Sequence, residues 1–325
     1  MKHRTRWLAA LVAIPLALAG CTATGNSNNS KDSAAPASGD KITIAVVSHG
    51  SPGDTFWDVV KSGAQQAAKD LGVNVTYQSD PDPVKQSQLI DSAVATHPAG
   101  LVVSMANPDG VKASVEKAVA AGIPVITINS GLEQSKAFGA ETHVGQSELI
   151  AGEAAGEKMA QAGVKNMICV IHEAGNTGLE DRCKGAAEKL GGTVSNVQVD
   201  VANIADAQNT IKSKLLADPS IDGVLTLNNG VAIAASQAIA EAKSKAQLGT
   251  FDVSADVTKQ IEDGKILFAV DQQPYTQGYL PVVFLTLQKR NGDVVGGGQP
   301  VYSGPGFVTK DNAAQVAKFA KNGTR

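Results

Sequence analysis

Short runs of apolar residues alternate along the chain with longer segments whose apolar residues recur every three or four positions. Runs that are apolar throughout are typical of strands buried on both faces of a parallel sheet, and the longer spacing is typical of amphipathic helices. The predicted strands are 42–47, 73–77, 100–104, 124–128, 167–171, 194–201, 223–227, 248–251 and 266–270. The predicted helices are 56–71, 84–95, 111–121, 144–162, 204–216, 232–242 and one that begins near Gly178.

This alternation of strand and helix predicts an α/β fold. It starts at Lys41 and restarts after the predicted helix 144–162, which gives two units of similar size. A chain of 325 residues is long enough for about two domains. We therefore expect two doubly wound parallel-sheet lobes with a cleft between them. We also expect Gly72, Gly100 and Gly122 to end helices.

The first twenty residues have the composition of an export signal. Basic residues at positions 2, 4 and 6 precede the apolar stretch 8–18, which is about half as long as a membrane-spanning helix. Leu18-Ala19-Gly20-Cys21 then matches the lipobox of bacterial lipoproteins. We predict a signal peptide at 1–20 and a lipid on the thiol of Cys21, with an ordinary secretory signal as the alternative.

Residues 22–40 contain Ser, Asn, Ala and Gly and no large apolar side chain. Such a segment cannot bury enough surface to fold, so we expect 21–40 to be a lipidated cysteine followed by a flexible tether. The predicted location is extracytoplasmic, anchored to the cell membrane by the lipid alone.

Charge and motifs exclude several classes of function. Without the three basic residues of the predicted signal, 25 basic residues face 31 acidic ones, a formal charge of −6. This balance argues against a nucleic-acid partner, because phosphate binding requires a basic face. The sequence contains no Walker loop, no G-x-S-x-G motif and no paired histidines of a zinc helix. We therefore expect no enzyme activity, no cofactor and no metal.

Two cysteines remain after Cys21, at Cys169 and Cys183. Disulfides persist in exported proteins, and the first cysteine falls in a predicted strand and the second in the helix that follows. We predict a disulfide between them, with two buried thiols as the alternative.

Polar and aromatic side chains follow the predicted strands. In open α/β sheets, ligands bind beyond the carboxyl ends of the strands. Carboxylates accept hydrogen bonds from hydroxyls, amides both donate and accept, and an aromatic face suits the C–H side of a sugar. The alternatives are helix caps and turns for the polar residues, and ordinary core for the aromatic ones. The candidates at strand ends are Asp54, Phe56, Trp57, Asn129, Asn228, Asp252 and Gln272, and His49 is a weaker one.

From residue 41 to about 310, the chain resembles the ribose/galactose-type periplasmic binding proteins, which have the type I solute-binding fold. The resemblance rests on the order and spacing of several short motifs together. They are Phe56-Trp57, Lys61-Ser62-Gly63-Ala64, Ile123-Pro124-Val125-Ile126-Thr127, Gly152-Glu153-Ala154-Ala155-Gly156, Leu227-Asn228-Asn229, Phe251-Asp252 and Asp271-Gln272-Gln273-Pro274.

The resemblance implies two lobes joined by three hinge strands, which ligand closes. The first lobe would hold 41–145 plus 274–302, and the second 146–273 plus 303–325. The function implied is capture of a monosaccharide or polyol for the permease of an ABC importer, by a monomer. Asp54, Phe56 and Trp57 match ligand contacts of the first lobe, and Asn228, Asp252 and Gln272 match those of the second.

Two positions depart from the ribose-type pattern. Asn129-Ser130 stands where those proteins carry Asp-Arg, and Glu180 stands where they carry an arginine on a helix. We take Asn129 and Glu180 as ligand contacts and expect no strong cationic donor beside them. This predicts a neutral ligand whose hydroxyls mainly donate, and argues against ribose and sugar acids. The alternative for Glu180 is an ordinary first-turn residue that points to solvent.

Other functions remain as alternatives. A repressor core of the lac type shares this fold, but would need an N-terminal helix-turn-helix in place of the signal and tether. An exported α/β enzyme would need an activated nucleophile beside His49 or Glu180, and none is apparent in the sequence. Within the binding class, the ligand could be a quorum signal or a nucleoside, and the partner a chemoreceptor or sensor kinase.

Overall fold

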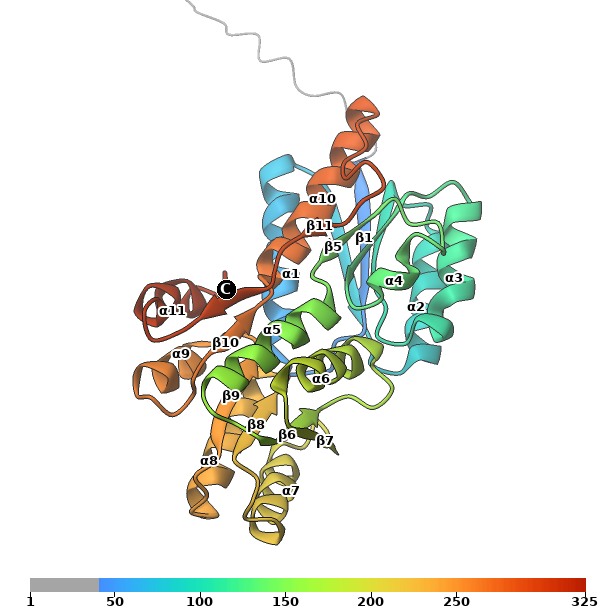
Figure 1. Cartoon of the computed structure of the whole chain (residues 1–325). Coiled ribbons are helices and arrows are strands. Elements are labelled where there is room, and N and C mark those ends of the chain that lie inside the picture. The colour runs from blue at the N-terminus through green and yellow to red at the C-terminus, as the bar shows by residue number, and fades with distance from the viewer. Residues whose placement is uncertain (1–40) are drawn as a thin grey trace, which may run out of the picture. The chain divides into compact units, whose positions relative to one another are not determined.

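A computed structural model describes residues 41–325, so the predicted signal peptide, Cys21 and the tether lie outside the described residues (Figure 1). The described part contains two six-stranded sheets. The first has the order β11-β5-β4-β3-β1-β2, with all pairs parallel. Its strands are β1 (Thr43–Ser48), β2 (Asn74–Ser79), β3 (Gly100–Ser104), β4 (Val125–Asn129), β5 (Thr142–Gly145) and β11 (Val301–Tyr302).

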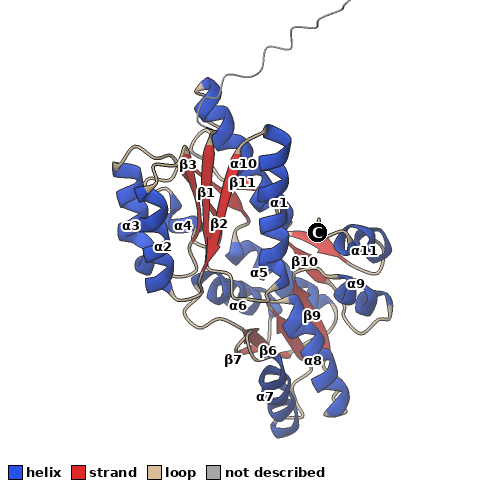
Figure 2. Cartoon of the chain, turned by 180° about the vertical axis from the view of Figure 1, so that it is seen from behind, coloured by secondary structure: helices blue, strands red, loops and turns tan. Residues whose placement is uncertain are grey.

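Helices cover both faces of this sheet (Figure 2). Even-numbered residues of β1 such as Ile44 and Val46 pack with α1 and α10, and their neighbours Ala45 and Val47 pack with α2 and α3. Side chains that alternate between two covered faces explain why the strand is apolar throughout. The helices are α1 (Thr55–Leu71), α2 (Pro83–Ala95), α3 (Pro108–Ala120), the short α4 (Leu132–Ser135) and α10 (Pro274–Asn291).

The second sheet has the order β12-β10-β9-β8-β6-β7. Its strands are parallel except β12, which pairs antiparallel with β10. Its strands are β6 (Asn166–Ile171), β7 (Thr193–Gln198), β8 (Gly223–Thr226), β9 (Gln247–Phe251), β10 (Ala269–Asp271) and β12 (Gly306–Val308). Its helices are α5 (Glu148–Gln161), α6 (Thr177–Leu190), α7 (Ile204–Ala217), α8 (Asn229–Glu241), α9 (Ala255–Glu262) and α11 (Ala313–Lys321).

The two sheets repeat one winding order. Part of the first sheet has the strand order β2-β1-β3-β4-β5, and the matching part of the second sheet has the order β7-β6-β8-β9-β10. The winding direction reverses between β1 and β3 and again between β6 and β8, and such switch points are where doubly wound sheets bind ligands. The chain is therefore two doubly wound α/β units, as the strand and helix pattern predicts.

The chain passes between the sheets three times, after β5, after β10 and after β11. Ser303 ties the three passages together, because its backbone N–H donates to Gly145 O at 2.6 Å and its hydroxyl donates to Gln272 O at 2.7 Å. The three passages lie near Gly145, Gln272 and Ser303.

Two expected features differ in the structure. Gly72 and Gly122 follow helices with positive φ, as predicted, but Gly100 opens β3. A Cβ at Gly100 would lie 2.7 Å from Leu285 of α10, so the glycine allows close packing there. The expected helix 144–162 is β5 followed by α5, because Ser147 caps the helix by accepting from Ile150 N. None of the helices within 41–325 has the length and apolar character needed to cross a bilayer.

Candidate functional site

A small cavity lies where the switch points of the two sheets meet. Its volume is about 20 Å³, so side chains nearly fill the space between the two halves. Beside it, a groove of about 680 Å³ opens to solvent and shares four residues with it, His49, His172, Glu173 and Asn176. These four residues therefore lie between the groove and the inner cavity.

The first sheet contributes the start of α1. Asp54 caps this helix, with its Oδ1 accepting from Phe56 N at 3.0 Å. Trp57 packs edge-on against Phe56 and His49, with ring centroids 5.1 and 4.7 Å apart. His49 in turn shares a hydrogen bond with the hydroxyl of Ser104, at the end of β3. Phe56 and Trp57 thus belong to the core and line the cavity at the same time.

Amide and carboxyl groups meet across the cavity from the ends of β4, β8, β9 and β10. The Asn129 amide donates to Gln272 Oε1 at 3.0 Å, and Gln272 donates to Asp252 Oδ1 at 2.7 Å. Asn228 donates to Asp54 Oδ1 at 3.4 Å. Asn129 and Asp252 have φ values of 61° and 67°. Asn and Asp tolerate this left-handed conformation better than most residues, and backbone strain of this kind is common at binding sites.

A buried ion pair supports the second half of the cavity. Arg182 of α6 donates from Nε to Glu148 Oε2 at 2.6 Å and from a terminal nitrogen to Oε1 at 3.0 Å. Gln146 donates to the same carboxylate at 2.9 Å. The Arg182 guanidinium also lies 4.6 Å from the ring centroid of Phe251. Since Glu148 balances its charge, Arg182 brings little net positive charge to the cavity.

Burial controls protonation in the cavity. It raises the pKa of Glu173 and of Asp252 to about 7 in each case, and it raises the pKa of Asp54. Burial, and to a smaller extent the charge of Arg182, lowers the pKa of His49 and of His172 to about 3. At neutral pH the two imidazoles are therefore neutral, and the carboxyls are the groups whose charge a ligand can change.

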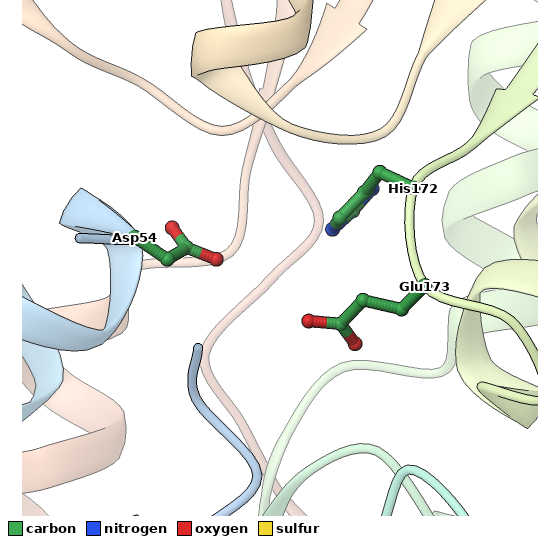
Figure 3. Close-up of side chains that lie close together, drawn as sticks. All are labelled: Asp54, His172 and Glu173. Atoms are coloured by element: carbon green, nitrogen blue, oxygen red, sulfur yellow. The ribbon is translucent and has the colours of Figure 1, made fainter. Parts of the chain in front are cut away.

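Three of these side chains form a compact group of donor atoms. Oxygens of Asp54 and Glu173 and a ring nitrogen of His172 lie within 4.8 Å of one another (Figure 3). Among residues 41–325 this is the group whose composition could hold a metal ion. The sequence-based expectation is that no metal binds.

Sequence comparison identifies the family of this fold. A model of the periplasmic binding protein domain matches residues 44–291, which is most of the chain. The chain belongs to the periplasmic binding protein family. The resemblance and fold class predicted from the sequence are thereby confirmed.

Individual relatives of this binding protein are all parts of transporters. It is 43% identical to a carbohydrate transporter from Acidothermus cellulolyticus, solved in complex with myo-inositol, with a TM-score of 0.86, over 88% of this chain and 100% of that one. It is 26% identical to the ribose import binding protein of Haemophilus influenzae, over 75% of this chain and 84% of the relative. It is 27% identical to the fructose import binding protein of Bifidobacterium longum, over 82% of this chain and 84% of the relative. The chain is a solute-binding protein and not an enzyme.

The structure brings together most of the ligand contacts predicted for this binding protein. Asp54, Phe56, Trp57, Asn129, Asn228, Asp252 and Gln272 all line the cavity. Glu180 does not line it: this residue is exposed on α6. The buried face of α6 contains Leu179, Arg182, Cys183 and Ala186, spaced three and four apart, so position 180 falls on the solvent side.

Sequence reasoning missed several residues of the cavity. Arg182 is the main one, and it corrects the expectation that the binding protein has no cationic donor there. Helical spacing around Cys183 could have found it. His172 and Glu173 follow β6 directly, where the strand-end rule applies. Asn176 caps α6 and donates to Glu173 Oε2 at 2.7 Å.

Cys169 of β6 and Cys183 of α6 form a disulfide, with their Cα atoms 5.8 Å apart. The bridge lies in the core on the α5–α6 face of the second sheet. It fixes α6 to its sheet one residue from Arg182, so it also holds one wall of the cavity.

Proposed function

We propose that this protein captures a small carbohydrate or polyol that carries no negative charge and delivers it to the permease of an ABC importer. The observation that carries the proposal is the lining of the cavity, which has the buried carboxyls of Asp54 and Asp252, the carboxyl of Glu173 and an aromatic wall. A buried polar group must find a partner. Carboxyl oxygens require donors, which ring hydroxyls supply and a sugar acid would oppose by repulsion.

The aromatic side chains of the cavity support a ligand with a ring. Phe56 and Trp57 line the cavity and offer apolar surface to one face of such a ring. The relative from Acidothermus cellulolyticus is 43% identical and was solved with myo-inositol. A cyclic polyol of this kind is therefore the first ligand to test.

Contacts between the two halves support closure around the ligand. Besides the Asn228–Asp54 contact, Thr55 donates to Asn229 Oδ1 at 3.2 Å, and Thr177 N donates to Ala106 O at 3.0 Å. A ligand that bridges Asp54 and Asp252 would add to these contacts. We infer that binding shifts the population from an open to a closed form about the three passages near Gly145, Gln272 and Ser303.

The family is extracytoplasmic, and we further propose that a lipid on Cys21 anchors this member to the membrane. The support is the sequence Leu18-Ala19-Gly20-Cys21 behind a basic and an apolar segment. Replacing Cys21→Ala should release the protein from membranes of its native host. Unchanged membrane retention of the variant would refute the anchor and leave the binding function untouched.

A thermal-shift screen over sugars, polyols, sugar acids and nucleosides tests the binding function, because a ligand that binds the folded state raises its stability by mass action. We expect a cyclic polyol or neutral monosaccharide to raise the melting temperature, and sugar acids to have no effect. A shift with nucleosides alone would refute the proposal.

A further inference from the structure

More carboxyl groups than cations line the cavity. Asp54 and Asp252 are buried, and the side chain of Glu173 is 14% exposed. The cation that lines the cavity, Arg182, is already bound by both oxygens of Glu148. Buried carboxylates without a cation are costly, and burial raises the pKa of all three carboxyls. The cavity therefore favours a ligand that brings positive charge.

One side of the cavity has unused acceptors. Asp54 accepts its hydrogen bonds at Oδ1, and Glu173 accepts its bond at Oε2, so within residues 41–325 the second oxygen of each has no hydrogen-bond partner. His172 is 6% exposed, and the hydrogen bonds of the described residues include none to its side chain. The ring nitrogen farther from its Cβ points toward the two carboxyl groups (Figure 3). Three possible acceptors thus lie close together.

We propose that Asp54, His172 and Glu173 form a subsite for a protonated amino group, so that amino sugars and aminocyclitols bind more tightly than their all-hydroxyl counterparts. The inference rests on the proposed function, because the amino group enters on a ring that the rest of the cavity holds. The subsite extends the ligand class from polyols to amine-bearing polyols.

Geometry matches this group. An ammonium has three donors in a tetrahedral arrangement, and with hydrogen bonds of about 2.9 Å its acceptors lie about 4.7 Å apart. One carboxyl oxygen of Asp54, one of Glu173 and a ring nitrogen of His172 lie no more than 4.8 Å from one another, which is compatible with this spacing. A hydroxyl has a single donor, so it would leave two of the three acceptors without a proton.

Charge supports the same occupant. Burial raises the pKa of Glu173 to about 7 and so disfavours its ionised form. An ammonium within hydrogen-bonding distance would attract the carboxylate and lower this pKa again. His172 is neutral and can accept, because burial lowers its pKa to about 3. Two carboxylates and one neutral imidazole suit a single cationic donor.

Calorimetric titration with matched ligand pairs tests the subsite. The first pair is myo-inositol and its analogues with one hydroxyl replaced by an amino group, taken as separate positional isomers. The second pair is D-glucose and D-glucosamine. At pH 7 we expect at least one amine to bind about tenfold or more tightly than its neutral partner, as charged hydrogen bonds of this kind imply.

Two variants separate the subsite from general electrostatics. Glu173→Gln keeps the side chain's size and should lower the ratio of amine to neutral affinity by about tenfold. Glu180→Gln removes the same charge from the exposed side of α6 and should leave the ratio unchanged. An equal effect of the two variants would overturn the subsite.

The remaining outcomes are distinguishable. If neutral ligands bind and every amine binds equally or more weakly, the subsite is refuted and the proposed function stands. If no sugar, polyol or amine binds, the proposed function fails and the subsite with it. If Ca²⁺, Mg²⁺ or Zn²⁺ alone stabilises the protein and displaces the amine, the three residues are a metal site, and the inference is wrong.

Discussion

Removing the charge of Glu148 should destabilise the protein far more than removing a similar charge from the same helix. The side chains of Arg182 and Glu148 are 3% and 5% exposed, and two hydrogen bonds join them. Glu148→Gln keeps the shape but removes the carboxylate that is hydrogen-bonded to the buried guanidinium. Breaking a buried pair in this way costs about 3–5 kcal/mol of unfolding free energy.

The matched control lies five residues further along α5. Glu153 pairs with Lys189 at 3.7 Å, and the two side chains are 29% and 50% exposed. Solvent screens such a pair, so Glu153→Gln should cost about 0–1 kcal/mol. Replacing both members of the buried pair, with Glu148→Leu and Arg182→Met, should recover much of the loss, because no uncompensated charge remains.

Chemical denaturation at pH 7, followed by circular dichroism, measures these differences. The same samples should show weaker ligand binding for Glu148→Gln, since Arg182 lines the cavity. Equal stability of the Glu148 and Glu153 variants would refute the role assigned to the buried pair. A double variant as unstable as Glu148→Gln alone would also contradict it, since packing and not charge would then explain the loss.

Three further predictions follow from the site. Saturating ligand should shift the fluorescence of Trp57, and Trp57→Ala should weaken binding by more than about 1 kcal/mol. An unchanged affinity would show that Trp57 serves only in the core and does not contact the ligand. Burial raises the pKa of Glu173 to about 7, so the wild type should lose about 3 kcal/mol of unfolding free energy relative to Glu173→Gln as the pH rises from about 4.5 to 7. Chemical denaturation in the absence of ligand measures this loss. A difference in stability between the two proteins that does not change with pH would contradict the burial of this carboxyl. Mass spectrometry of unreduced, denatured protein should find Cys169 and Cys183 bridged, and two alkylatable thiols would refute the disulfide.

Much of the fold can be predicted from the sequence because parallel strands buried on both faces are apolar throughout. β3 begins and ends where the pattern places it, at Gly100 and Ser104. By contrast, β11 and β12 have two and three residues, which is too short for any period to appear. Their pairing depends on the chain returning to each sheet, which is a tertiary effect.

The candidate site can likewise be predicted from the sequence only in part. Asn228 and Asp252 could be predicted because the ends of parallel strands meet at one edge of a sheet. The pairing of Arg182 with Glu148 joins residues 34 positions apart, so no local pattern reveals it. The resemblance to ribose-type proteins predicts Glu180 in the cavity, whereas the three- and four-residue spacing of the buried face of α6 places it on the solvent side.

The measurement that tests the central claim most directly is calorimetric titration of the purified protein with myo-inositol and a panel of neutral monosaccharides, beside an Asp252→Asn variant. We predict that one of these ligands binds with one-to-one stoichiometry and a Kd of about 1 μM or lower, equivalent to about 8 kcal/mol. The variant should bind that ligand at least about tenfold more weakly, since Asp252 lines the cavity and its second oxygen is free for a ligand hydroxyl. The account would be contradicted if none of these ligands gave a heat of binding, or if the Asp252→Asn variant bound the ligand as tightly as the wild type.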